Sequence, residues 1–304
     1  MKQEELFGCE PMSKKVDLVA RVEEMAAKAK KKLAPPLENS KNNNVVQLPL
    51  WPDEVRAIPN GFLRSALFGV IKTGARQYMK SELIAAVEGV EIRYTGERLD
   101  QGDLDTFETV LHAVRLQNLG NKCRVTSYSL LKLLGQSPCG KNRATLHSRI
   151  TRLVANALEL KTGRYSYIGS LIADAAKDEE NQEWVIELNP KLRSLFAADQ
   201  FTNVDWKIRN SLSGKPLAQW LHGFYASHAA PFPFRIETLH KLCGSEATVM
   251  SDFTKTLRKA LDAVKAASEG FDYEIQNGLV YIKKKATNTQ KKHLLKKTIT
   301  KKKQ

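Results

Sequence analysis

The pattern of apolar and polar positions recurs once along the chain, at an offset of 109 residues. In each copy the spacing predicts a β-prone opening, a helix, a short strand, a second helix, a turn, a third helix and a β-hairpin. The segments of the first copy are residues 90–94, 103–117, 123–126, 129–135, 142–160, 164–171 and 183–188. Those of the second copy are residues 201–206, 215–228, 231–236, 237–244, 248–268 and 271–283, where Asn277-Gly278 is a strong hairpin turn. Identical residues support the match: Leu130, Lys132, Leu133 and Gly135 recur as Leu239, Lys241, Leu242 and Gly244.

This order of elements predicts a winged helix, in which the last helix of a helix-turn-helix can enter the major groove of DNA beside a β-hairpin. Two copies predict an α+β chain of tandem winged-helix type, that is, two winged helix-turn-helix domains with a flexible N-terminal leader and a basic C-terminal tail. The predicted domain boundaries are 1–46 for an N-terminal helix and linker, 47–195 for the first winged-helix domain with the segment before it, 196–285 for the second, and 286–304 for a basic, disordered tail.

The third helix of each copy combines an apolar stripe with a basic face. The predicted stripes are Leu146, Ile150, Leu153, Val154, Ala157 and Leu158 in the first copy, and Val249, Phe253, Leu257, Ala260, Leu261 and Val264 in the second. Outside them lie Lys141, Arg143, Thr145, Ser148, Arg149 and Arg152, and then Ser251, Lys255, Arg258 and Lys259. We predict that these ten residues contact DNA; a solvated basic face without a partner is the alternative.

Composition and charge agree with a polyanionic partner. The 304 residues include 48 Lys and Arg against 33 Asp and Glu, a formal charge of +15. Ten lysines and no acid lie between Lys283 and Gln304, which leaves +5 on the first 282 residues. A DNA-binding surface in the body of the protein must therefore be a local patch.

The four cysteines, Cys9, Cys123, Cys139 and Cys243, are too scattered for a disulfide framework or a zinc site, and we expect buried, reduced thiols. No apolar run approaches the ~20 residues that span a bilayer, and the first ten residues are polar and acidic. We therefore expect a cytoplasmic protein.

Candidate enzyme signals are weak, and we expect no catalytic residues, metal or cofactor. The segment GQSPCGKN, residues 135–142, fits a phosphate-binding loop except that Asn142 replaces the Ser or Thr that binds magnesium. It also follows a predicted helix where the motif needs a strand, so a P-loop-like ATPase is kept only as an alternative of another class. The histidines form no His-x-His pair, and His222 and His228 are expected to pack or hydrogen-bond.

Three segments resemble the TrfA replication initiators of broad-host-range plasmids: residues 48–71, 96–116 and 212–244. The resemblance implies two winged-helix domains and a plasmid DNA replication initiator that binds repeated origin sites (iterons) in double-stranded DNA. It further implies opening of an adjacent AT-rich region that becomes single-stranded, recruitment of the host replicative helicase and the DnaA initiator, and an inactive self-dimer. Such a protein would be associated with the plasmid or nucleoid. A dimeric winged-helix transcriptional repressor is the alternative among DNA-binding proteins.

The segment QLPLW resembles the pentapeptide by which proteins bind the bacterial sliding clamp. Gln47, Leu48, Leu50 and Trp51 match the pattern, while Pro49 departs from it but suits an extended peptide. The resemblance implies that these four residues bind the host clamp. A core role for Leu50 and Trp51 at the start of the folded domain is the alternative.

Overall fold

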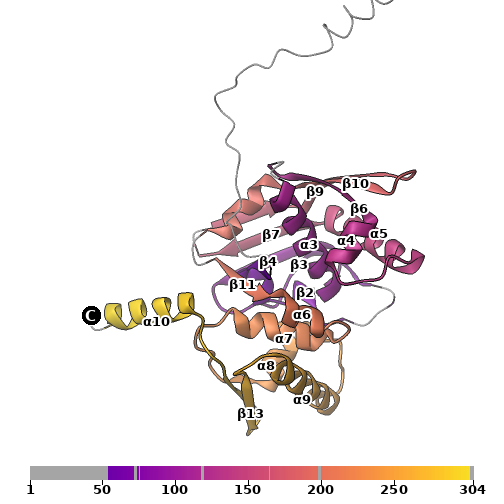
Figure 1. Cartoon of the computed structure of the whole chain (residues 1–304). Coiled ribbons are helices and arrows are strands. Elements are labelled where there is room, and N and C mark those ends of the chain that lie inside the picture. Colours follow the sequence, from indigo (N-terminus) through magenta and orange to yellow (C-terminus); the bar gives the residue numbers. More distant parts are fainter. Residues whose placement is uncertain are drawn as a thin grey trace, which may run out of the picture. The chain divides into compact units, whose positions relative to one another are not determined.

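The structure is a computed structural model, and it describes residues 54–301 apart from 72–73, 75, 118–119, 164 and 198–199. The chain divides into residues Met1–Val45 and Val46–Gln304, and every described residue belongs to the second unit (Figure 1). The predicted N-terminal helix and linker, Cys9 and the segment Gln47–Trp51 lie outside the described residues.

The first part of the described chain mixes strands and helices, as the α+β prediction requires. Its elements are β1 (Val55–Pro59), α2 (Asn60–Leu63), β2 (Phe68–Gly69), β3 (Tyr78–Leu83), β4 (Val90–Glu97), β5 (Leu99–Asp100), α3 (Gln101–Gln117), β6 (Lys122–Thr126), α4 (Ser127–Leu133), α5 (Gly140–Val154), β7 (Ala157–Thr162), β8 (Tyr165–Gly169), β9 (Ile172–Asp178), β10 (Glu183–Leu188) and the 3-10 helix η1 (Pro190–Phe196).

The second part is shorter and repeats much of this order. Its elements are β11 (Phe201–Asp205), α6 (Trp206–Ser211), α7 (Pro216–Ala226), β12 (Phe234–Arg235), α8 (Ile236–Leu242), α9 (Met250–Ala267), β13 (Asp272–Gln276), β14 (Leu279–Lys283) and α10 (Asn288–Lys301). The order α3–β6–α4–α5 of the first part therefore recurs as α7–β12–α8–α9.

The sheets confirm that the two parts are built alike from α3 and α7 onward. In the first repeat the short strand pairs with the second strand of the hairpin, giving the order β6-β10-β9. In the second repeat the order β12-β14-β13 is the same, and all of these pairs are antiparallel. The predicted turn is present: Asn277 and Gly278 both have positive φ, 51° and 75°, as a two-residue hairpin turn requires.

Between α5 and its hairpin the first repeat carries two extra strands, and here the sequence prediction was wrong. Residues 142–160 were expected to form one helix, but α5 ends at Val154, where the Asn156 side chain donates hydrogen bonds to the carbonyls of Arg152 and Leu153. Leu158 and Leu160 then point inward from β7, and Ala157 is exposed. Apolar residues at these positions fit both a helix and an alternating strand, so the pattern alone could not separate them.

The strand pairing of the first repeat also differs from the prediction. Residues 164–171 and 183–188 were expected to pair as its hairpin, but β8 pairs with β7, and the partner of β10 is β9, which the sequence analysis missed. The four-stranded sheet β3-β4-β7-β8 includes β4, so the segment 90–94 is not the counterpart of residues 201–206. Those residues form β11, which pairs antiparallel with β1.

Two clusters of buried side chains form the core, one in each part of the chain. The first is centred on α3, where Leu104, Phe107, Val110 and Leu111 are at most 1% exposed. The second gathers α7, α8 and α9 against the β13–β14 hairpin. Burial of these apolar faces is the main force that holds each repeat together.

The basic tail is helical over residues 288–301, so the prediction of a disordered tail was wrong there. The helix starts at a capping box in which Thr287 Oγ1 accepts from the amide of Gln290 (3.3 Å) and Gln290 Oε1 accepts from the amide of Thr287 (3.2 Å). The Thr-x-x-Gln spacing is a sequence signal for the start of a helix, but the lysine-rich composition is typical of a disordered tail and favoured the wrong prediction.

Candidate nucleic-acid interface

Helix α5 is held on the first repeat by the apolar stripe that the sequence predicted. Leu146, Ile150 and Leu153 are at most 2% exposed, and the helix packs on α3 and α4. The preceding helix α4 is capped by Thr126, whose hydroxyl accepts from the amide of Ser129. The outer face of α5 is thereby fixed toward solvent.

Of the predicted contact residues on α5, Lys141, Arg143 and Ser148 are exposed, and Thr145 is half-buried. The hydroxyls of Thr145 and Ser148 donate to the carbonyls of Lys141 (3.0 Å) and Ala144 (3.1 Å) one turn earlier. These bonds leave the hydroxyl oxygen lone pairs facing outward as acceptors. The N-terminal half of α5 therefore presents two cations and two hydroxyls to solvent.

Arg149 and Arg152 face the start of α3 instead. Arg152 donates two hydrogen bonds to Asp103 Oδ1, 2.8 Å from Nη2 and 3.2 Å from Nε, and its side chain is 13% exposed. The Arg149 guanidinium lies against the backbone of Gly102, where a Cβ would be 2.1 Å from its Nη2. Arg152 is thus a structural ion-pair partner of a buried carboxylate, and Arg149 is only partly available to a ligand.

Helix α9 exposes its predicted face fully. Phe253, Leu257, Leu261 and Val264 are at most 2% exposed and pack inward. Ser251, Lys255, Arg258 and Lys259 are exposed, and Lys255 forms an ion pair with Asp252 at 3.4 Å. Val249, which was assigned to the apolar stripe, is the 52% exposed residue before the helix, so the stripe begins one turn later.

The hairpins beside the two helices differ in charge. The β9–β10 turn carries Asp178, Glu179 and Glu180, all exposed, and only Glu179 has a cation nearby, Lys177 at 2.6 Å. The β13–β14 turn is the neutral Gln276-Asn277-Gly278. Like-charge repulsion from phosphates disfavours close approach of the first hairpin tip to DNA, whereas the second tip has no such obstacle.

The two repeats are joined by buried polar contacts that fix α5 relative to α9. Arg209 of α6 is fully buried and donates to Asp105 and, at 3.0 Å, to Gln101 Oε1, both on α3. Gln219 of α7 donates to the other Asp105 oxygen at 3.0 Å. Trp220 Nε1 donates to the Ser65 carbonyl at 3.1 Å. Because most of these groups are buried, a shift of one repeat against the other that broke the pairs without admitting water would leave donors and acceptors unsatisfied, so the contacts favour one arrangement of the repeats.

A further link joins the loops next to the repeats. Arg98 donates from Nη2 to the Gly244 carbonyl and from Nη1 to Glu246, each at 2.9 Å. Gly244 follows α8 in the turn that leads to α9, so this arginine connects the first repeat to the helix-turn-helix of the second. Sequence reasoning found neither Arg98 nor Arg209, since their partners lie more than 100 residues away.

Residues 135–142 span the loop between α4 and α5 and the first three residues of α5. The Asn142 side chain donates to the Ser137 carbonyl (2.8 Å) and to its hydroxyl (3.2 Å), which closes the loop on itself. A helix precedes it, as expected, and not the strand of a phosphate-binding loop. Cys139 is exposed at the start of α5, contrary to the expectation of a buried thiol, while Cys123 and Cys243 are buried and free.

His222 and His228 are packed, as the sequence analysis expected. His222 is 8% exposed, and burial together with the charge of Arg209 lowers its pKa to about 4. His228 Nδ1 lies 2.7 Å from the Phe224 carbonyl, and its ring packs on Phe224 with centroids 4.5 Å apart. Within the described residues no group of three or more His, Cys, Asp or Glu side chains could hold a metal ion.

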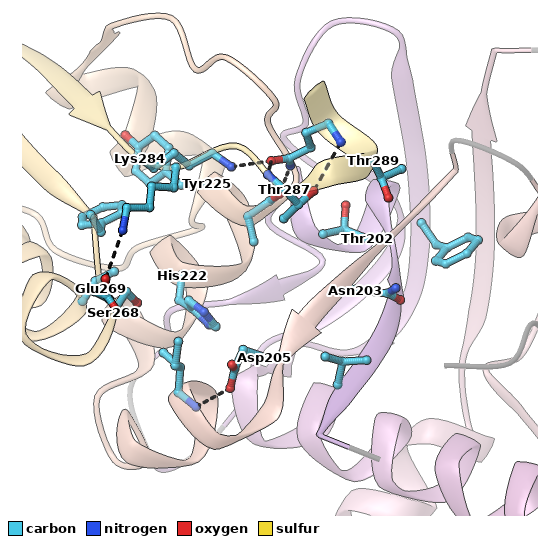
Figure 2. Close-up of a pocket in the computed structure, with 18 residues that line it drawn as sticks. Thr202, Asn203, Asp205, His222, Tyr225, Ser268, Glu269, Lys284, Thr287 and Thr289 are labelled. Atoms are coloured by element: carbon cyan, nitrogen blue, oxygen red, sulfur yellow. Dashed lines mark hydrogen bonds and ion pairs between the residues drawn. The ribbon is translucent and has the colours of Figure 1, made fainter. Parts of the chain in front are cut away.

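A cavity of about 630 Å³ lies beside His222 and Tyr225 of α7 (Figure 2). β1, β11, α6, the C-terminal end of α9 with the loop after it, and the segment from Lys284 into α10 also line it. None of the ten predicted DNA-contact residues borders it. The predicted interface is therefore a pair of exposed helix faces and not a pocket.

Among the described residues no helix is long and apolar enough to cross a membrane.

Comparison with known proteins identifies the family to which the chain belongs. The family model described as TrfA protein matches residues 14–284. The chain belongs to the TrfA family. The plasmid replication initiator protein TrfA of Escherichia coli is 27% identical over 244 residues, which cover 77% of this chain and 63% of that relative. This TrfA-family chain thus matches less than two thirds of the length of the E. coli protein.

The chain is also similar to a second curated protein and to a solved structure. RepFIB replication protein A of Escherichia coli is 25% identical over 256 residues, covering 78% of this chain and 77% of that protein. Among solved structures, domains 2 and 3 of RctB superpose with a TM-score of 0.50 at 14% identity, covering 74% of this chain and 96% of that structure. The second likeness is one of fold alone.

Proposed function

We propose that this TrfA-family chain is a plasmid replication initiator that binds repeated duplex sites of its origin through α5 and α9. The observation that carries the proposal is the matched placement of these helices, each after the same short helix and turn and beside a sheet of the same strand order. In this proposal each repeat is a winged helix and the chain is a tandem winged-helix protein. The names of the relatives TrfA and RepFIB replication protein A support replication as the process.

The exposed side chains divide naturally between phosphates and bases. Lysines such as Lys141, Lys255 and Lys259 suit phosphates, because an ammonium group is a point charge without a fixed hydrogen-bonding geometry. Arg143 and Arg258 can donate two parallel hydrogen bonds to a guanine edge. Both lie on helices of the predicted type and are exposed, so they are the strongest candidates for base reading.

The buried contacts between the repeats support a fixed spacing of two contacts on DNA. Arg209, Asp105 and Gln219 hold α6 and α7 against α3, which in turn packs on α5. A protein whose two reading helices are held in this way favours one separation of the two sequence elements within a site. Insertion of a few base pairs between those elements should therefore abolish binding.

Recruitment of host proteins is proposed from the family resemblance. In it, Gln47, Leu48, Leu50 and Trp51 bind the host sliding clamp, other surfaces engage the replicative helicase and DnaA, and a self-dimer is the inactive form. Replacement of Leu50 and Trp51 by Ala should abolish clamp binding and leave duplex binding intact. A variant that instead unfolds would favour the core role of these two residues.

The test is a titration with duplex carrying the direct repeats expected beside the gene, against a scrambled duplex of equal length and composition. We expect binding to the repeats that is about 10³-fold tighter or more at physiological salt. Equal affinity for both would contradict the proposal.

A second experiment separates an initiator from a repressor. An initiator opens the neighbouring AT-rich DNA and makes its unpaired thymines chemically reactive, whereas a repressor does not.

A further inference from the structure

Helix α10 is a basic element outside the matched family region. It begins at Asn288, four residues beyond the end of the family match at residue 284. Its 14 residues include five lysines, at positions 291, 292, 296, 297 and 301, and no acid. Lys291 and Lys292 are exposed, and none of the described side chains of α10, residues 288–295, is buried. Over residues 288–295, buried apolar packing therefore does not account for the helix.

The start of α10 is fastened to the second repeat by a group of hydrogen bonds that we call the Gln290 clasp. Gln290 Nε2 donates to the carbonyl of Ala226 at the end of α7 (2.7 Å). Gln290 Oε1 accepts from Lys284 Nζ (3.0 Å) and from the amide of Thr287 (3.2 Å). Figure 2 shows Lys284 and Thr287 converging on this point at the edge of the cavity. The clasp fixes where the basic helix leaves the body, as Figure 1 shows for α10 extending away from the sheets.

A fastened start distinguishes α10 from a tail that only confers solubility. Such a tail needs charge but no order, whereas a contact element gains affinity when its shape is set before binding. A helix of 14 residues is about 21 Å long, which matches about six successive phosphates of one DNA strand. Lysines without a neighbouring acid suit phosphates and cannot discriminate bases.

We propose that α10 is an additional contact to duplex DNA, an ordered basic arm that binds phosphates outside the sequence read by α5 and α9. The inference rests on the proposed DNA-binding function, and it adds an element that the family match does not contain. The arm contributes salt-dependent affinity that is independent of base sequence. The clasp contributes by holding the arm in place.

The experiment uses the full chain and random-sequence duplex, titrated at several salt concentrations. In the arm variant, Lys291, Lys292, Lys296 and Lys297 are replaced by Gln. In the matched control, four exposed lysines of the body are replaced by Gln: Lys80, Lys161, Lys191 and Lys207. We expect the arm variant to flatten the slope of log affinity against log salt by about 2 to 4 units, since each lost phosphate contact removes about 0.9. The control should change it by less than one unit.

Gln290→Ala tests the clasp separately, because it keeps every charge of the arm. We expect a several-fold loss of affinity for random duplex with the thermal unfolding of the body unchanged. Affinity equal to wild type would mean a flexible tail and would overturn the ordered arm. Equal flattening by the arm variant and the control would overturn the arm as a specific contact.

The proposed role of α10 can fail while the proposed function of α5 and α9 holds, and the two outcomes can be told apart. The ratio of affinities for repeat-bearing and scrambled duplex should stay near the wild-type value in the arm variant, because α5 and α9 are intact. Binding of the wild type, but not of the arm variant, to vesicles with anionic phospholipid, together with an unchanged DNA salt slope, would assign the arm to membranes and overturn the DNA contact.

Discussion

Arg209, fully buried in the second repeat, donates through its Nε to a carboxylate oxygen of Asp105 in the first repeat. The other Asp105 oxygen accepts from Gln219, so the aspartate is held by two elements of the second repeat at once. Arg209 and Asp105 lie 104 positions apart in the sequence, so no local pattern indicates their contact. In the structure Asp105 joins the two halves of the predicted DNA interface.

Replacement of Arg209 should destabilise the protein strongly. Arg209→Met leaves Asp105 and Gln101 without their buried donor, and removal of one partner of a buried ion pair costs about 3 to 5 kcal/mol. Urea unfolding measures the change in the free energy of unfolding. The matched control is Lys207→Met, two residues earlier on α6, where the side chain is exposed. This variant should stay within about 0.5 kcal/mol of wild type. A loss in Arg209→Met of the same small size would contradict a stabilising role of this contact.

The arginines of α5 should separate into DNA contacts and structural residues. Arg143→Ala should weaken specific duplex binding by about 1 to 3 kcal/mol without lowering the melting temperature, because its side chain is exposed. Arg152→Ala should lower the melting temperature, because Asp103 is buried and would keep only Arg76, at 3.0 Å, as a cationic partner. Binding titrations and thermal unfolding of both variants check this. Unchanged stability in Arg152→Ala would show that the Asp103 pair is dispensable.

How far the sequence predicted the fold depends on the range of the interactions involved. The helices of the second helix-turn-helix and the Asn277-Gly278 hairpin follow from local periodicity and turn chemistry, and the structure confirms them. In the first, α5 ends six residues before the predicted helix does, because residues 157–162 form β7. β9 was missed because its sequence IADAAKD has few residues that favour strands; it forms through pairing with β10. The pairing of β1 with β11 joins segments about 146 residues apart, so no local signal could have revealed it.

For the candidate site too, local spacing predicts some features, and contacts between distant elements decide the others. Exposure of Lys255, Arg258 and Lys259 follows from the helical period of α9, and the structure confirms it. The period of α5 places Arg152 outside the apolar stripe equally well, yet Asp103 of α3 captures it. Whether a cation on a helix faces solvent or a buried carboxylate is decided by the neighbouring element, which the spacing does not contain.

Stability should fall as the pH drops below about 6.5. Burial lowers the pKa of His222 to about 4 from 6.5, so between these values the unfolded chain binds more protons than the folded one. The contribution is fully present above pH 6.5 and is lost as the pH falls toward 4. One pKa unit is 1.36 kcal/mol, so His222 accounts for a loss of about 2 kcal/mol between pH 7 and 5.

The variant His222→Gln isolates this contribution. Its free energy of unfolding should fall less steeply with acid than that of the wild type, by about 2 kcal/mol over the same interval. Urea unfolding at pH 7 and pH 5 measures both slopes. Parallel pH profiles of the two proteins would show that His222 is not the group responsible.

If α5 and α9 both read the same repeated site, footprints of one variant of each helix should differ in a defined way. One variant carries Lys141→Ala and Arg143→Ala on α5, and the other carries Lys255→Ala and Arg258→Ala on α9. Hydroxyl-radical footprints on repeat-bearing duplex should show two protected regions for the wild type. Each variant should lose a different one of these regions and keep the other. Protection that is unchanged in both variants, or lost at the same positions in both, would show that α5 and α9 do not read separate parts of one site.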